Sequence, residues 1–407
     1  MKILVLNAGS SSQKSCLYHI SQNTLPPHHP EPIWQANIDW TAQANTGLLE
    51  VKANGNQQEI KLDPNKRLEG MSKLLECLIT GETQVIQDYS EIDIVGHRIV
   101  HGGSDYSEAT EITPEVKETI RQLTPLAPNH NPAHLEGIKA IENILKNVPQ
   151  VAVFDTAFHR KMPKFATVYP IPYHWYKKGI RRYGFHGTSH KYCAQKAAEL
   201  LNKPLDSLQL ITCHLGNGAS LAAIKDGISV DTTMGFTPLE GLMMGTRSGS
   251  IDPAIVIYLM QNYQMNAEEI DKMLNKESGI KGITGTSGDM RYVTSAMQQG
   301  DLQAKLAFEM FIHHLKTSIG SMLGNLTKLD ALIFSAGIGE HSAIVREAAC
   351  SGLEYLGMQL DTDKNNQSSI DTDISKQDSP VRILIIHTEE DWAIATECFH
   401  LFKQKFK

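Results

Sequence analysis

Short apolar runs alternate with longer, helix-like segments along most of this chain. Runs of strand length lie at residues 3–6, 92–95, 151–154, 208–213, 331–334 and 382–386. Segments with helical spacing of apolar residues separate them, at 115–123, 134–146, 189–202, 303–323 and 342–356. This alternation predicts an α/β architecture. The polar stretches at 21–35 and 361–380, rich in Pro or Asp, are predicted to be peripheral loops.

Length and composition limit the classes of protein to which the chain can belong. At 407 residues it is long enough for two domains, because single cores stop growing near about 250–300 residues. A net charge of −7 argues against a nucleic-acid partner. The six cysteines form no C-x-x-C pair, which favours reduced thiols. We expect a cytoplasmic protein with no membrane partner, because neither a signal peptide nor a membrane span of about 18 apolar residues is present.

The segment NAGSSSQKS, residues 7–15, follows the first apolar run and looks like a phosphate loop without its glycines. Lys14-Ser15 matches the end of the P-loop pattern G-x-x-x-x-G-K-[ST], but Ala8 stands at the first glycine and Gln13 precedes the lysine. A P-loop leads into a helix, whereas SQKSCLYHI alternates polar and apolar residues, as a strand does. The segment is therefore predicted to be the turn of a β-hairpin.

A similar unit, LQLITCHLGNGASLAAIKDG, lies about half a chain later. There an apolar strand ends at His214, passes through Gly216-Asn217-Gly218 and returns as SLAAI. Two such hairpins at this spacing predict a duplicated fold in which one turn from each half faces a shared cleft. A third turn, Gly337-Ile338-Gly339, lies between a strand and a helix. It lacks the third glycine of the dinucleotide fingerprint, so we do not expect NAD, although such a helix start can approach a nucleotide.

Three arginines lie among small residues. They are Arg98 in GHRIVHGG, Arg247 in MMGTRSGS and Arg291 in TGTSGDMR. The planar guanidinium matches carboxylate or phosphate oxygens with two parallel hydrogen bonds, so these residues are candidates to bind an anion. The alternative is a solvated surface arginine. Asp155 ends a predicted buried strand, where ligand crevices of α/β folds form, or else caps the next segment.

Other motifs support competing hypotheses. His97 and His101 have the spacing of a zinc-binding H-E-x-x-H helix, but residue 98 is Arg where the general base belongs. The segment 173–190 interleaves aromatic and basic residues, as single-stranded nucleic-acid platforms do, and also holds His186. That support is weak in an acidic chain. The acids at 389–391 either complement the dipole of a C-terminal helix or support a divalent metal.

Together these pieces resemble the acetate kinase family, within the short-chain acid kinases of the sugar kinase/Hsp70/actin superfamily. The matching segments occur in the family's order and are NAGSSSQK, HRIVHGG, FDTAFH, RRYGFHGTSH, HLGNGAS, MGTRSG, SAGIGE and EEDWAIA. The resemblance implies reversible, Mg-dependent transfer of a phosphoryl group between ATP and acetate, which gives acetyl phosphate and ADP. It also implies two duplicated actin-like domains with an interdomain nucleotide cleft. We expect one domain at 1–155 plus 386–407 and the other, which carries nucleotide and a homodimer contact, at 156–385.

Matched residue by residue, the resemblance implies roles for single side chains. Asn7 and Glu390 would support the metal, Mg²⁺ or Mn²⁺ as the alternative, and Lys14 would contact a nucleotide phosphate. The set implied to act on acetate and the phosphoryl group is Arg98, Asp155, His186 and Arg247. The further residues implied to meet ATP are His214, Leu215, Gly216, Asn217, Gly218, Asp289, Met290, Arg291, Gly337, Ile338, Gly339, Glu340 and His341.

The pocket for the acid departs from the family at one position. Val100, Phe185 and Pro238 would line it, but Asn129 stands where the family commonly has an apolar residue. A preference for propionate or butyrate therefore remains open at this point. A different alternative is an ATP-binding module without transferase activity, which has no need of a pair of arginines to clamp a carboxylate.

The nucleophile decides what is expected of Asp155. Acetate, with a pKa of about 4, is already ionised at pH 7 and needs no general base. We therefore expect Asp155 to orient groups or metal-bound water. The family's TNEE appears here as Thr388-Glu389-Glu390-Asp391, so the acid that meets metal is inferred from the register of the following AIA.

Overall fold

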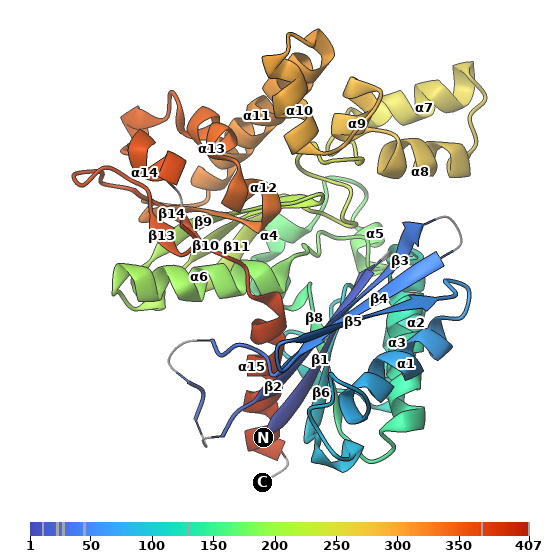
Figure 1. Ribbon diagram of the computed structural model, residues 1–407. Helices are drawn as coiled ribbons and strands as arrows, with labels where there is room; N and C mark the ends of the chain where they lie inside the picture. The colour runs from blue at the N-terminus through green and yellow to red at the C-terminus, as the bar shows by residue number, and fades with distance from the viewer. Residues whose placement is uncertain are drawn as a thin grey trace. The chain divides into compact units, whose positions relative to one another are not determined.

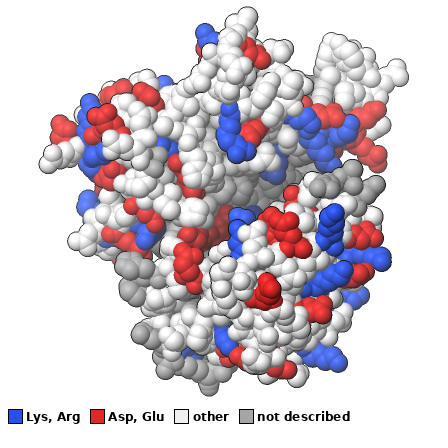
Figure 2. Space-filling model, in the orientation of Figure 1, with Lys and Arg blue, Asp and Glu red and all other residues white. Residues whose placement is uncertain are grey.

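The computed structural model describes residues 1–407 apart from 10, 11, 22, 23, 27, 28, 44, 45, 129, 368, 406 and 407. The chain separates into two compact units. The first unit is Met1–Ala157 with Glu389–Lys407, and the second unit is Phe158–Thr388. No helix of the described residues is both long and apolar enough to cross a membrane. On the face drawn in Figure 2, basic and acidic side chains are interspersed.

An eight-stranded mixed sheet forms the centre of the first unit, in the order β5-β4-β3-β2-β1-β6-β8-β7 (Figure 1). Its strands are β1 Lys2–Ala8, β2 Ser12–His19, β3 Trp34–Gln43, β4 Thr46–Ala53, β5 Asn56–Leu62, β6 Ile94–Ile99, β7 Thr110–Glu111 and β8 Gln150–Phe154. Strands β1 to β5 pair antiparallel, whereas β1, β6 and β8 pair parallel.

The helices of the first unit cover this sheet with apolar faces. They are α1 Arg67–Ile79, α2 Pro114–Gln122, α3 Asn131–Ile144 and α15 Glu390–Lys405, with the 3₁₀ turns η1 Tyr89–Glu91 and η2 Thr124–Leu126. Leu4 and Leu6 of β1 share a buried cluster with Leu74 of α1 and Ile141 of α3. Helix α15 packs so closely on β6 that a Cβ at Gly96 would collide with Cys398. The C-terminal helix therefore belongs to the core of the N-terminal sheet.

The second unit is built around a six-stranded sheet, in the order β11-β10-β9-β12-β14-β13. Its strands are β9 Gln209–Leu215, β10 Ala219–Lys225, β11 Ile228–Thr232, β12 Ala331–Ser335, β13 Thr372–Asp373 and β14 Arg382–Ile385. Its helices are η3 Ala157–Lys161, α4 Lys164–Thr167, α5 His174–Lys177, α6 Gly187–Leu201, η4 Leu205–Ser207, α7 Pro253–Asn262, α8 Ala267–Lys276, α9 Gly279–Thr284, α10 Met290–Gln298, α11 Leu302–Leu323, α12 Ala336–His341, α13 Ala343–Cys350, η5 Glu354–Leu356 and α14 Thr362–Gln367.

The two sheets repeat one topology. In the first unit β3-β2-β1 run antiparallel and are followed by the parallel β6 and β8, and in the second β11-β10-β9 are followed by β12 and β14 in the same way. Each sheet ends in an antiparallel strand of two residues, β7 or β13. The predicted α/β class and duplication are thus confirmed. Both predicted hairpins are present, because Asn7 pairs with Lys14 and His214 with Ser220.

One predicted loop is wrong. The segment 361–380 contains α14 and β13, and Asn365 of α14 is fully buried. The Asn365 side chain accepts a hydrogen bond of 2.8 Å from Arg346 Nε, and its amide donates to Ala343 O at 3.0 Å. These bonds satisfy polar groups that composition alone assigns to solvent. The segment 21–35 also runs into β3, which begins at the buried Trp34.

Candidate active site

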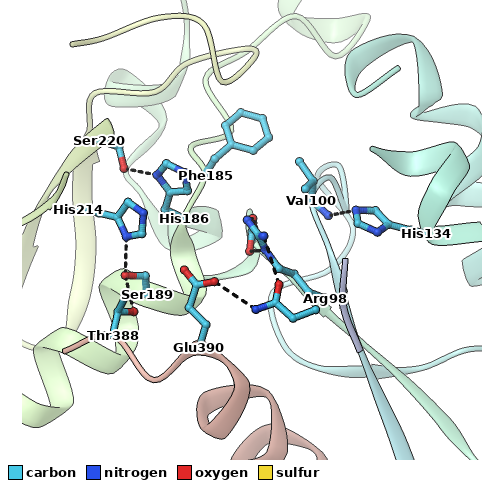
Figure 3. A network of polar contacts seen from close by, with 12 residues as sticks. Arg98, Val100, His134, Phe185, His186, Ser189, His214, Ser220, Thr388 and Glu390 are labelled. Carbon is cyan, nitrogen blue, oxygen red and sulfur yellow. Dashed lines mark hydrogen bonds and ion pairs between the residues drawn. The ribbon is translucent and has the colours of Figure 1, made fainter. Parts of the chain in front are cut away.

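In the first unit, Asn7 connects two acids to an arginine. It lies near the end of β1, and its Nδ2 donates to Asp391 Oδ1 at 2.8 Å and to Glu390 Oε2 at 3.5 Å. Its Oδ1 accepts from Arg98 Nη1 at 3.3 Å, and Figure 3 shows Glu390 at the start of α15. Burial raises the pKa of Asp391, and the bond from Asn7 opposes this rise. The Asn7 amide therefore holds a pair of carboxylates in place.

Arg98 and Asp155 form a close ion pair at the carboxyl ends of two neighbouring strands. Arg98 is the penultimate residue of β6, and Asp155 follows β8. Arg98 Nε donates to both carboxylate oxygens at 3.1 Å, and Nη2 donates to Oδ2 at 2.7 Å. Burial opposes the charge of Arg98, but Asp155 and Glu390 raise its pKa above the ordinary value. The guanidinium is thus charged and held in one orientation, and Asp155 is the residue that holds it.

Of the residues predicted to line the acid pocket, Val100 belongs to the first unit, and Phe185 and Pro238 belong to the second. Val100, directly after β6, is buried, and its N–H donates to His134 Nε2 at 3.3 Å (Figure 3). Phe185 is buried in the second unit, where Pro238 O accepts from Arg247 Nη1 at 3.1 Å. Asn129 lies outside the described residues.

Two histidines stack beside the second hairpin. The His186 and His214 rings lie 4.2 Å apart with an interplanar angle of 27°. His186 Nδ1 hydrogen bonds to Ser220 Oγ at 2.8 Å, and His214 Nδ1 bonds to Ser189 Oγ at 2.8 Å (Figure 3). Thr388 donates in turn to Ser189 Oγ at 2.9 Å. His186 has a φ of +57°, an uncommon backbone conformation for a residue with a side chain, and it precedes α6. These bonds fix both imidazole rings.

A second, buried histidine shares the Ser220 hydroxyl that bonds to His186. His190, four residues later on α6, is fully buried and bonds to Ser220 Oγ at 2.8 Å and to Thr212 Oγ1 at 2.7 Å. Burial lowers the pKa of His190 well below its ordinary value, so the ring is neutral. Ser220 therefore lies between two histidines and, with one hydroxyl hydrogen, donates to only one of them.

Gly218 lies close to both His186 and Arg247. A Cβ at Gly218 would lie 3.5 Å from both Arg247 Nη1 and His186 Nε2. A Cβ at Gly245 would overlap Asn217 Oδ1, and Gly245 N donates to Asn217 O at 3.1 Å. The glycines thus allow the MGTRSG segment to approach the turn of β9 and β10.

Arg247 is a half-buried cation whose described neighbours are neutral. Its Nη1 donates to Pro238 O at 3.1 Å and approaches Met244 Sδ at 3.8 Å. Within the described part of the chain it forms no ion pair with a carboxylate. Burial lowers the pKa of Arg247. A guanidinium in this setting is stabilised by a bound anion, and phosphate and carboxylate groups match its geometry.

The other residues predicted to meet nucleotide fall into four places. Lys14 is exposed on β2, opposite Asn7. Asp289 precedes α10 and pairs at 2.6 Å with Arg291, whose side chain is 92% exposed, while Met290 is buried. The residues of the second hairpin and of the helix after β12 are Leu215, Gly216, Gly337, Ile338, Gly339, Glu340 and His341.

Glu340 points back into its own unit. It is 4% exposed, and its carboxylate accepts from Thr388 N at 3.3 Å and hydrogen bonds to His387 Nδ1 at 2.6 Å. Burial acts to raise the pKa of Glu340, but His387 and the backbone N–H groups of Thr388 and Ala336 together lower the pKa below the ordinary value. Glu340 therefore holds the chain that leads into α15.

Sequence reasoning missed the partners of the predicted residues. The pairing of Asp155 with Arg98 had no sequence signal, and neither did the bond between His134 and Val100. Ser220 and His190 did leave one, because a serine stands among the apolar residues of ASLAAI and HGTSH places two histidines one helical turn apart. In the described residues no cluster of three or more His, Cys, Asp or Glu side chains has metal-binding geometry. Mg²⁺ needs none, because it binds through one or two carboxylates, substrate phosphates and water.

Comparisons with known proteins agree along the whole chain. A model described as the acetokinase family matches residues 2–396. An acetate kinase from Rippkaea orientalis is 64% identical over 400 residues, which are 98% of this chain and 99% of that protein. The solved acetate kinase of Porphyromonas gingivalis is 38% identical, with a TM-score of 0.89 over 98% of this chain and 99% of that one. A solved propionate kinase from Francisella tularensis is 40% identical, with a TM-score of 0.88 over 97% and 98% of the two chains.

Proposed function

Because this chain belongs to the acetokinase family, we propose that it catalyses the reversible phosphorylation of acetate by ATP, which gives acetyl phosphate and ADP by direct in-line transfer. The observation that carries the proposal is Arg247, a half-buried guanidinium whose described hydrogen-bond partners are neutral. A nucleotide switch without transferase activity has no use for such a group. A phosphoryl group with charge on three oxygens matches it.

The reaction needs fixed positive charge more than acid–base chemistry. Phosphoryl transfer passes through a loose transition state, so catalysis depends on positioning and electrostatic stabilisation. Arg98 meets this need because Asp155 holds its Nε and Nη2 while Asn7 accepts from Nη1. Asp155 is paired with Arg98, and acetate is already ionised at pH 7 and needs no general base. We therefore propose that the role of Asp155 is to orient Arg98.

The second unit supplies groups for the phosphates. We assign the stabilisation of the transferring phosphoryl group to His186 and Arg247, which both approach Gly218. The segment from His214 to Gly218 leads through the tight turn between β9 and β10, where Gly216 and Gly218 have no side chain that would keep a phosphate away from the backbone. Asp289 to Arg291 are assigned to the nucleoside, together with Gly337, Ile338, Gly339 and His341, whereas the Glu340 side chain is engaged within its own unit.

The residues near Asn7 fit a divalent cation. Glu390 and Asp391 offer carboxylate oxygens, which Mg²⁺ and Mn²⁺ prefer, and the Asn7 amide holds both acids. We assign Glu390 as the residue that holds the ion, with Asp391 beside it. When bound with ATP, Mg²⁺ neutralises charge on the phosphate oxygens. Lys14, across the hairpin from Asn7, adds a further positive charge for a phosphate.

The second unit also exposes apolar side chains that support self-association. Helix α7 has no buried residue, and its apolar side chains Ile255, Ile257, Tyr258 and Met260 are 44% to 56% exposed. Exposure of several large apolar side chains on one helix is typical of an interaction site. We therefore propose a homodimer through the second unit. Light scattering on the eluting protein should give twice the chain mass, and Ile257→Glu should give the mass of one chain, whereas a monomeric wild type would refute this assignment.

The decisive test of the activity is hydroxamate trapping of the acyl phosphate. Wild-type protein with ATP, MgCl₂ and hydroxylamine should form acetohydroxamate when acetate is added and none without an acid. Parallel reactions with propionate and butyrate rank the acids, and we expect acetate to give the highest kcat/KM. A wild-type protein that forms no hydroxamate with any of the three acids refutes the proposal.

A further inference from the structure

A buried histidine supports the backbone of the proposed acid pocket. His134 is 2% exposed and lies on the face of α3 that also carries the buried residues Asn131, Ile138 and Ile141. Its Nε2 accepts a hydrogen bond of 3.3 Å from the backbone N–H of Val100 (Figure 3). An apolar side chain would pack on this face without desolvating a polar ring. The imidazole is therefore placed where only its hydrogen bond offsets the cost of burial.

Val100 needs this partner because it lies just beyond the sheet. Strand β6 ends at Ile99, whose carbonyl accepts from Asp155 N at 2.9 Å. Successive backbone groups along a strand point to opposite sides, so the N–H of Val100 points away from β8. The ring of His134 accepts it there. Without that acceptor a buried N–H would have no partner within the described residues, which costs free energy.

The ring is held in one protonation state and one tautomer. Burial, together with the charges of His130 and Arg98, lowers the pKa of His134 well below its ordinary value, so the ring is neutral. Because Nε2 accepts from Val100, the hydrogen is on Nδ1. Nδ1 is buried and has no hydrogen-bond partner among the described residues. Among the described residues, the hydrogen bond from the Val100 N–H is thus the one that the His134 ring makes.

We propose that His134 is a positioning residue that sets the shape of the acid pocket, by fixing the backbone at Val100 and, two residues earlier, the start of the Arg98 side chain. This inference rests on the proposed function, because Val100 and Arg98 are assigned there to the acid. Val100 would limit the length of the acid, and Arg98 would bind its carboxylate. A shift of this backbone would therefore alter affinity for the acid and the preference between acetate and propionate, while leaving ATP binding unchanged.

Two substitutions at one position separate this role from simple packing. In His134→Gln the side-chain Oε1 reaches approximately the place of Nε2 and can accept from Val100. In His134→Leu the volume is similar but the acceptor is lost. The matched control is Ile138→Ala, which removes a fully buried side chain from the same face of α3 and makes no bond to Val100. It should lower the melting temperature without changing acid selection.

The kinetic readout is KM for each acid and for ATP, measured by hydroxamate trapping. We expect His134→Leu to raise KM for acetate about tenfold and to raise the propionate-to-acetate ratio of kcat/KM at least about threefold, with KM for ATP unchanged. His134→Gln should stay within about twofold of wild type. If His134→Leu keeps wild-type acid selection, or if Ile138→Ala changes it equally, the positioning role is refuted.

A second readout does not depend on activity. Hydrogen exchange at the Val100 amide should be at least about tenfold faster in His134→Leu than in wild type, and near wild type in His134→Gln. An unchanged exchange rate refutes the proposed bond, whatever the enzyme does. If exchange at Val100 is faster in His134→Leu but the wild-type protein forms no acyl phosphate, the bond is supported and the proposed function is contradicted. The two failures are therefore distinguishable.

Discussion

Replacing Asp155 with Asn removes the anion that orients Arg98 while preserving shape. In the structure Arg98 Nε and Nη2 make three contacts of 2.7 to 3.1 Å to the Asp155 carboxylate, whose side chain is 3% exposed. An amide keeps one oxygen acceptor, but its NH₂ group faces a guanidinium N–H. One charge-assisted bond is lost and another is weakened. The hydrogen bond from Arg98 Nη1 to Asn7 Oδ1 remains.

The magnitude follows from these contacts. Hydrogen bonds to charged groups contribute about 1.5–3 kcal/mol each, and breaking a buried pair costs about 3–5 kcal/mol. Arg98 keeps some access to water, with 18% of its side chain exposed, so we expect a cost somewhat below that of a fully buried pair, about 2–4 kcal/mol. If this loss falls on the transition state, turnover drops by about 30-fold to 1,000-fold.

The assay compares kcat from hydroxamate trapping with the free energy of unfolding from denaturant titration. Asp155→Asn should lose turnover by the factor above and about 2–4 kcal/mol of stability. The control is Glu142→Gln, which removes a partly exposed ion pair with Lys117 in the same unit and should cost less than about 1 kcal/mol. A folded Asp155→Asn protein with turnover within about threefold of wild type would refute the assignment of Asp155 as the support of Arg98.

Three further outcomes are expected. Arg247→Ala should lower kcat by about 10²–10³-fold in the trapping assay with little loss in the free energy of unfolding, because its described partners are neutral; a loss of stability as large as that of Asp155→Asn would contradict this. Asn7→Ala should raise the Mg²⁺ concentration for half-maximal activity about tenfold, and an unchanged metal titration would remove Asn7 from the cation site. Burial lowers the pKa of His97 and of His159 to about 4, so the folded state stays neutral while the unfolded chain takes up protons below pH 6.5. The free energy of unfolding should therefore be flat from pH 7 to 8 and fall by about 1.4 kcal/mol per pH unit for each histidine between pH 6.5 and about 4. In denaturant titrations at several pH values, His97→Gln should reduce this pH dependence of the free energy of unfolding by the contribution of one proton. Equal slopes in wild type and variant would show that folding does not lower the pKa of His97.

Several strands that the sequence predicted as apolar runs are buried on both faces. β8, β9 and β12 read as continuous apolar runs because each residue of these strands is buried. β4 and β5 were missed, since β4 alternates buried with more exposed residues, β5 has one buried residue, Leu62, and both contain charged side chains. The polar segment 361–380 was wrongly predicted as a loop because composition does not show that Asn365 binds the buried Arg346.

The sequence predicted individual residues of the candidate site but not which of them contact one another. Arg98 and Arg247 were singled out by their small neighbours and Asp155 by its place at a strand end, whereas His186 was assigned only through the family resemblance. The bond between Asp155 and Arg98 depends on β6 and β8 being neighbours in the sheet, although the sequence separates them widely. Roles for these residues remain proposals that the variants above test.

By itself the sequence determined the α/β class, the duplicated hairpins and the kinds of side chain available to the site, because periodicity and turn composition are local properties. The segment NAGSSSQKS was correctly predicted to be a hairpin, since its polar–apolar alternation is that of a strand. Only the tertiary structure decided that Asn7 holds Asp391, that Asp155 holds Arg98 and that His134 holds Val100. The physical reason is that these bonds join elements far apart in the chain. Their geometry is set by sheet order and helix packing.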